Sequence, residues 1–155
     1  MLRKMWRFIL GVIRYIMLSI TKACAALDYR HYWSYGVQGV EDVNNDPAGT
    51  AWPASWVDKV GNLWLFGGYH YHSGFNAFNA LWKYNITTGN WTWMKGSNVP
   101  NSWWVLGTQG VEDSNNTPGA LKGMASSVDE SGHFWLFGGS LGGSVTLNDL
   151  WKYIP

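Results

Sequence analysis

The sequence predicts an all-β fold made of repeated antiparallel strands, and three observations support this prediction. The chain of 155 residues contains 12 Trp and 19 Gly, whereas charged residues make up only 14%. Large aromatic side chains suit the cross-strand positions of short strands, and glycines suit the tight turns that join them. Apolar and polar residues also alternate in several short segments. Finally, blocks of the sequence occur twice at a nearly constant separation, which is typical of a repeat protein.

Three sequence blocks recur in the same order, and in the first of them Gly107 follows Gly36 by 71 residues. The blocks are GVQGVEDVNNDP (36–47) and GTQGVEDSNNTP (107–118), GNLWLFGG (61–68) and GHFWLFGG (132–139), and NALWKY (79–84) and NDLWKY (148–153). Three matches in one order do not arise by chance. The chain is therefore predicted to contain two copies of one structural unit.

Each copy is expected to begin with a short strand and a turn, followed by an apolar strand that a glycine pair ends. The expected strands are 55–57, 63–66, 81–84 and 91–94 in the first copy, and 126–128, 134–137 and 150–153 in the second. In the third strand, Trp82 and Tyr84 face one side and Lys83 faces the other. Four strands joined in this order form an antiparallel meander, which is the unit of a propeller blade.

The segment GNLWLFGG…NALWKYNITTGNWTWMKG resembles the kelch motif, in particular the Trp-rich kelch repeats of bacterial surface and secreted proteins. This resemblance implies a kelch β-propeller and, for most members, protein or ligand binding rather than catalysis. The residues that match the motif, and to which it assigns structural roles, are Gly67, Gly68, Trp82, Tyr84, Trp91, Gly138, Gly139, Trp151 and Tyr153. The repeat of about 70 residues exceeds the usual kelch length of about 50. The surplus falls in residues 96–119.

The expected fold class is therefore a partial kelch β-propeller over residues 31–155, with blade-like repeats at about 35–95 and 106–155. It contains a little under two four-stranded antiparallel blades, because the fourth strand occurs only once. Propellers close with about 4–8 blades, so we expect a truncated piece of a larger propeller. Assembly of several chains into one ring is the alternative. Bare blade faces also predict self-association.

Residues 1–26 have the pattern of a secretory leader, with basic residues first and then an apolar, helix-like stretch from Phe8 to Ile20. Small residues suited to cleavage surround Cys24. We expect a signal peptide or a membrane-proximal anchor, and hence a secreted, periplasmic or cell-surface protein. A start codon placed too early is the alternative. Arg14 interrupts the apolar stretch, which is too short and too charged for a comfortable membrane span. Membrane contact is expected only through this leader.

The charge distribution argues against nucleic-acid binding. Residues 31–155 contain five Lys, no Arg and nine acidic residues, which gives a net charge of −4. Phosphate recognition depends on clustered Lys and Arg. The lack of Arg also argues against sialidase chemistry, which needs a planar donor for the substrate carboxylate. A kelch-type copper oxidase needs a Cys in the folded domain, and Cys24 is the only one.

The expected function is therefore a binding scaffold for a protein or carbohydrate, with no catalytic residue, metal or cofactor. A fragment of a carbohydrate-active kelch enzyme, such as a sugar mutarotase or epimerase, is the enzyme alternative. The sequence from Asp42 to Asp46 resembles the start of a calcium-binding loop. However, Pro47 occupies the position of the conserved glycine of such loops, and no Glu follows at their twelfth position. We therefore interpret it as a loop that caps its own backbone.

The candidate ligand-binding residues lie in the connections after the glycine pair and after the fourth strand. In a meander, alternate connections leave on opposite sides of the sheet. The short turns at 58–61, 85–90 and 129–132 therefore share one side, and the long connections at 69–78, 96–119 and 140–147 share the other. Aromatic residues with nearby polar groups suit sugar stacking or a protein hot spot. The candidates are Tyr69, His70, Tyr71, His72, Phe75, Trp103 and Trp104, and Phe78 is expected on the same side.

Overall fold

The computed structural model describes residues 33–71, 74–142 and 145–155. The all-β prediction is confirmed, because these residues form antiparallel sheets and contain no helix. None of them accordingly belongs to a helix able to cross a membrane. The expected leader at 1–26 and the candidate His72 lie outside the described residues. The chain divides between Tyr32 and Trp33 into two units, and everything below concerns the second.

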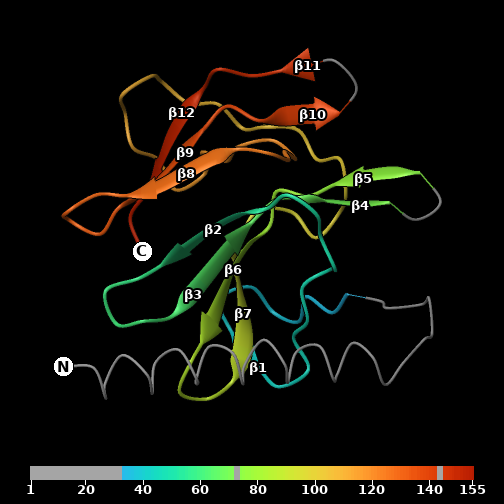
Figure 1. Ribbon diagram of the computed structural model, residues 1–155, viewed down its shortest axis with the longest axis vertical. Coiled ribbons are helices and arrows are strands. Elements are labelled where there is room, and N and C mark those ends of the chain that lie inside the picture. The colour runs from blue at the N-terminus through green and yellow to red at the C-terminus, as the bar shows by residue number, and fades with distance from the viewer. Residues whose placement is uncertain (1–32, 72–73, 143–144) are drawn as a thin grey trace, which may run out of the picture. The chain divides into compact units, whose positions relative to one another are not determined.

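The first repeat forms a five-stranded antiparallel sheet (Figure 1). Its strands are β1 (Glu41–Asp42), β2 (Ala54–Val57), β3 (Leu63–Phe66), β6 (Leu81–Asn85) and β7 (Asn90–Lys95). The spatial order is β1-β7-β6-β3-β2, so the four predicted strands form the expected meander. The fifth strand was not predicted. In it, Glu41 lies opposite Thr92 and Asp42 opposite Trp91, so the start of the repeat pairs with its last strand.

The second repeat forms a three-stranded sheet in the order β12-β9-β8. Its strands are β8 (Ala125–Val128), β9 (Phe134–Phe137) and β12 (Leu150–Tyr153). Each connection after a glycine pair was expected to be a loop and instead holds a hairpin. These hairpins are β4 (Tyr69–Tyr71) with β5 (Phe75–Ala77), and β10 (Ser140–Gly142) with β11 (Val145–Thr146). Residues 69–71 and 75–77 pair across a short connection, so most of the first of these connections is regular structure.

The glycine pairs are required by both backbone conformation and space. Gly67 and Gly68 have φ angles of 66° and 87°, a left-handed conformation that favours glycine. A Cβ on Gly67 would lie 2.7 Å from the Leu121 carbonyl oxygen. Gly138 and Gly139 in the second repeat are also left-handed, with φ angles of 65° and 103°. The motif therefore ends a strand where two chain segments approach closely.

The main core lies between the two repeats. Trp56, Trp64 and Phe66 of the first sheet are buried together with Phe134 and Leu136 of the second. The Trp56 ring stacks on Phe134 with ring centroids 5.2 Å apart, and the Trp64 ring meets Phe134 edge-on at the same distance. These rings come from alternate strand positions, so one face of the first sheet packs on the opposite face of the second.

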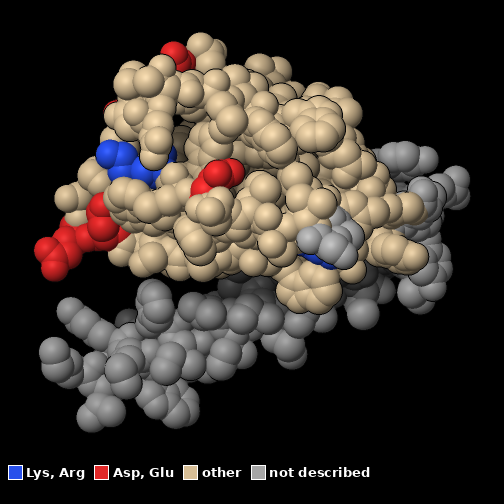
Figure 2. All heavy atoms as spheres, turned by 90° about the horizontal axis from the view of Figure 1, so that it is seen from above, with Lys and Arg blue, Asp and Glu red and all other residues tan. Residues whose placement is uncertain are grey.

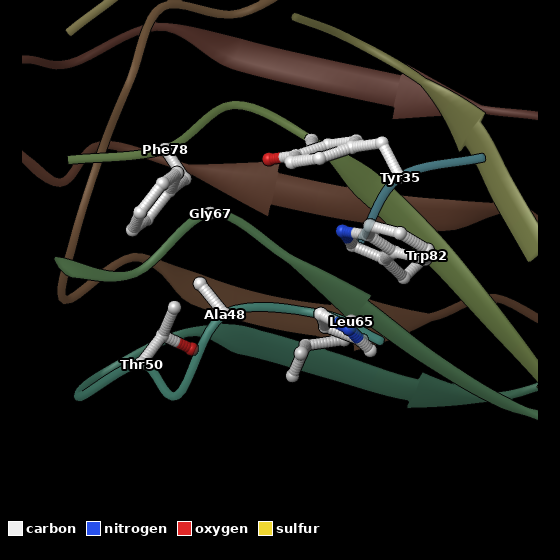
Figure 3. Close-up of a pocket in the computed structure, with 9 residues that line it drawn as sticks. Tyr35, Ala48, Thr50, Leu65, Gly67, Phe78 and Trp82 are labelled. Carbon is white, nitrogen blue, oxygen red and sulfur yellow. The ribbon is translucent and has the colours of Figure 1, made fainter. Parts of the chain in front are cut away.

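The other face of the first sheet is covered in part by the start of the same repeat. Tyr35 and Trp82 are buried there, with ring centroids 5.0 Å apart. Figure 3 shows Tyr35, Ala48 and Thr50 gathered around Leu65 and Trp82. The cavity among these residues measures about 10 Å³, which leaves room for a water molecule at most. This interface is therefore packing rather than a ligand site.

Candidate functional site

The short turns lie at one end of the first sheet and the long connections at the other, as predicted. The short turns lie together, since the Ile86 amide donates a hydrogen bond to the Asn62 side-chain oxygen. At the other end, the connection after β7 is fixed to β5. The Asn101 amide donates to the Ala77 carbonyl at 2.8 Å, and its side chain donates to the Phe75 carbonyl at 3.1 Å. We call this second end, with its hairpins and long connection, the long-loop side.

Four residues on the long-loop side form what we call the aromatic cluster: Trp52, Tyr69, Phe75 and Lys122. The Tyr69 ring stacks on Trp52 and on Phe75, with ring centroids 5.3 Å apart in each pair. The Lys122 ammonium lies 4.4 Å from the Tyr69 centroid, 4.9 Å from Phe75 and 5.2 Å from Trp52. These distances are within cation–π range for all three rings. Tyr69 and Phe75 were predicted as site residues, whereas Trp52 and Lys122 were not.

Trp52 has an unusual backbone conformation. Its φ angle is 55°, which costs a residue with a bulky side chain about 1–2 kcal/mol. The equivalent residue 71 positions later is Gly123, whose φ angle is 67°. Both repeats therefore need a left-handed residue here, and only the second uses glycine. The Trp52 side chain is nevertheless 61% exposed.

The β4–β5 hairpin separates the predicted residues onto two faces. Tyr71 lies opposite Phe75, on the same face as Tyr69, and is 80% exposed. His70 points to the other face, where its Nδ1 lies 2.8 Å from the Gly49 carbonyl oxygen and its ring meets Trp33 edge-on. His70 is therefore part of the packing beneath the hairpin and does not join the aromatic cluster.

Trp103 and Trp104 form a second aromatic pair on the long connection. Their rings meet edge-on with centroids 5.3 Å apart. Trp103 is 74% exposed, whereas Trp104 is half-buried against Gly119. Of these two residues, only Trp103 therefore exposes most of its aromatic surface to solvent. Phe78, which was expected among the surface aromatics, is buried against Trp33 with ring centroids 5.4 Å apart, so that prediction is wrong.

The described residues give no sign of a metal site, since no three His, Cys, Asp or Glu side chains gather among them. In the calcium-like loop, the Asp42 carboxylate accepts hydrogen bonds from the backbone and side chain of Asn44, at 2.8 and 2.9 Å. In the second repeat, Asp113 accepts from the Asn115 amide at 2.7 Å. These bonds support the interpretation of both loops as self-capping turns.

A wider hollow of about 480 Å³ lies near the short turns. Its lining is mostly apolar and includes Val57, Leu63, Leu65 and Trp91. In the second repeat, the counterparts of Leu63 and Leu65 are Phe134 and Leu136, which are buried against the first repeat. The hollow is therefore a sheet face of the kind that packs against another repeat.

No family model, curated protein or solved structure matches this chain.

Proposed function

We propose that residues 33–155 form a little under two successive blades of a kelch-type β-propeller that serves as a binding module. The observation that carries this proposal is the contact between equivalent strands of the two repeats. The Trp56 indole donates to the Ser127 carbonyl at 3.1 Å, and the Ser126 hydroxyl donates to the Ser55 carbonyl at 3.4 Å. Both pairs join residues of β2 to residues 71 positions later, at the same places in β8.

Contacts between equivalent strands are expected when repeats are arranged around a common axis with β2 and β8 innermost. This is the geometry of propeller blades. The packing of opposite sheet faces in the main core supports the same arrangement, because each blade then covers its neighbour. The kelch family is supported by the sequence motif and by the left-handed glycine pairs that end the second strand.

Binding through the long-loop side is supported by the distribution of exposed aromatic rings. Tyr71, Trp52 and Trp103 are all more than half exposed, and all belong to the hairpins and connections on this side. Long connections are costly to order and often carry function. The short turns contain no aromatic residue. A secreted or cell-surface location, which the leader-like sequence favours, would suit a protein or glycan ligand.

The proposal is tested with the full chain on a glycan array and on a panel of candidate surface proteins. Replacing Trp103 with Ala should weaken the binding found by about 1–3 kcal/mol, the cost of losing an aromatic contact at an interface. Val60→Ala is the matched control, because Val60 is a 78% exposed apolar residue in a short turn. If Val60→Ala loses binding and Trp103→Ala does not, the ligand binds on the side of the short turns, which would contradict the proposal.

A further inference from the structure

The aromatic cluster combines features that a purely structural role does not require. A glycine meets the backbone demand at this turn, as Gly123 does in the second repeat. The first repeat instead carries Trp52, with a strained φ angle and most of its ring in solvent. Strain that is retained at an exposed residue often marks a functional site.

The shape of the cluster suits one kind of ligand. The Tyr69 ring lies at 23° to Trp52 and at 17° to Phe75, so the three rings form a nearly parallel series with exposed Trp52 at one end. A pyranose ring presents a flat face of C–H groups that packs on an aromatic face. Its hydroxyl groups need polar partners close to such a surface. The Lys122 ammonium lies over the three rings, and Tyr71 is an exposed residue opposite Phe75 in the hairpin, so both side chains can serve as such partners.

The charges favour an uncharged ligand over a polyanion. Lys122 is the single cation of the cluster, and its charge already faces three aromatic rings. The net charge of −4 over residues 31–155 opposes the approach of polyanions. We propose that the aromatic cluster binds a neutral saccharide, with a sugar ring packed on Trp52 and hydroxyl groups bound by Lys122 and Tyr71. This inference rests on the proposed function and assigns it a ligand class and a site.

The test uses the full chain with cellohexaose, hexa-N-acetylchitohexaose and mannohexaose as neutral probes, and heparin and an oligothymidylate as anionic probes. Binding is followed by calorimetry at two salt concentrations. At least one neutral hexasaccharide should bind with an affinity that salt hardly changes, since no counterions are released. Trp52→Gly, which introduces the residue of the second repeat, should weaken this binding at least about tenfold.

Melting temperature separates a binding role from a structural one. Because glycine accepts the left-handed backbone, Trp52→Gly should leave the melting temperature within about 2 °C of the parent or raise it. A large fall in melting temperature, with the affinity of the folded protein unchanged, would overturn the proposal. Binding of heparin or the oligothymidylate alone, or of no neutral probe, would also overturn it. If Trp52→Gly keeps binding that Trp103→Ala loses, this site is wrong while the proposed function stands.

Discussion

At the scale of single residues, an aspartate starts the short turn before the apolar strand of each repeat and organises the strand that follows. In the first repeat, Asp58 accepts hydrogen bonds from the Asn62 amide at 2.8 Å and from the Trp64 indole at 3.0 Å. In the second, Asp129 accepts from the His133 amide and the Trp135 indole, both at 2.9 Å. The signal for this contact was present in the sequence, since both repeats place a Trp six residues after the Asp.

These bonds make stability depend on pH at the acidic end. Hydrogen bonds, above all from the Trp135 indole, lower the pKa of Asp129 from 3.8 to about 2. The folded state therefore favours the ionised carboxylate. Its stabilising contribution is complete above about pH 4 and is lost as the pH falls towards 2. We expect Asp129→Asn to lower the melting temperature at pH 5, and this difference from the parent protein should shrink between pH 4 and pH 2.

The control for this prediction is Glu130→Gln, because Glu130 is a neighbouring exposed carboxyl with no hydrogen bond among the described residues. Its melting curve should follow that of the parent protein at every pH. A constant difference between Asp129→Asn and the parent from pH 5 to pH 2 would show that the hydrogen bonds do not depend on ionisation.

The glycine pair gives a second prediction at this scale. Gly67→Ala should destabilise the fold by about 1–3 kcal/mol, because the new Cβ meets the Leu121 carbonyl in a left-handed conformation. Gly49→Ala is the control. Gly49 is not left-handed, and nothing lies within 4 Å of the Cβ position. Chemical denaturation measures both variants, and equal losses of stability would remove the structural reason for the pair.

At the scale of elements, the sequence predicted the regular strands almost to the residue. Alternation placed Trp82 and Tyr84 together, and the glycine pair marked the end of β3, because both signals are local. Strand β1 was missed because Glu41 and Asp42 have no strand preference of their own, and only pairing with β7 makes them a strand. The hairpins were not predicted, although aromatic and polar side chains alternate at residues 69–71. The length of the connection after the glycine pair indicated a loop.

The candidate site was predicted in part for the same reason. Tyr69, Tyr71, Phe75 and Trp103 stood out as aromatic residues in long connections. Trp52 and Lys122 belong to segments that precede β2 and β8, and only the fold brings them to Tyr69. Alignment of the two repeat sequences matches Trp52 with Gly123, and this difference is the signal that could have identified the position.

At the scale of the whole repeat pair, equivalent residues have different environments. Phe66 and Leu81 are 4% and 5% exposed, whereas their counterparts Phe137 and Leu150 are 50% and 63% exposed. The view from the side of β10, β11 and β12 shows few charged side chains (Figure 2). A sheet face with these properties resembles the one that the first repeat buries in the main core.

We therefore expect purified residues 31–155 to self-associate through this face. Leu150→Lys should reduce the association, because a charge would have to be buried at the contact. Val60→Lys, at an exposed apolar position in a short turn, should leave it unchanged. Sedimentation velocity over a range of concentrations measures both. A monodisperse monomer at every concentration would contradict the prediction.

The pairing of β1 with β7 has a consequence for how such a protein can change its length. The first and last strands of one repeat are hydrogen-bonded to each other, so the unit of sequence and the unit of structure share the same boundaries. Duplication or deletion of one whole stretch of coding DNA would then add or remove a complete sheet. No neighbouring sheet would lose its outer strand in the process. A gene organised in this way can gain or lose whole repeats without an intermediate sequence in which a sheet is incomplete.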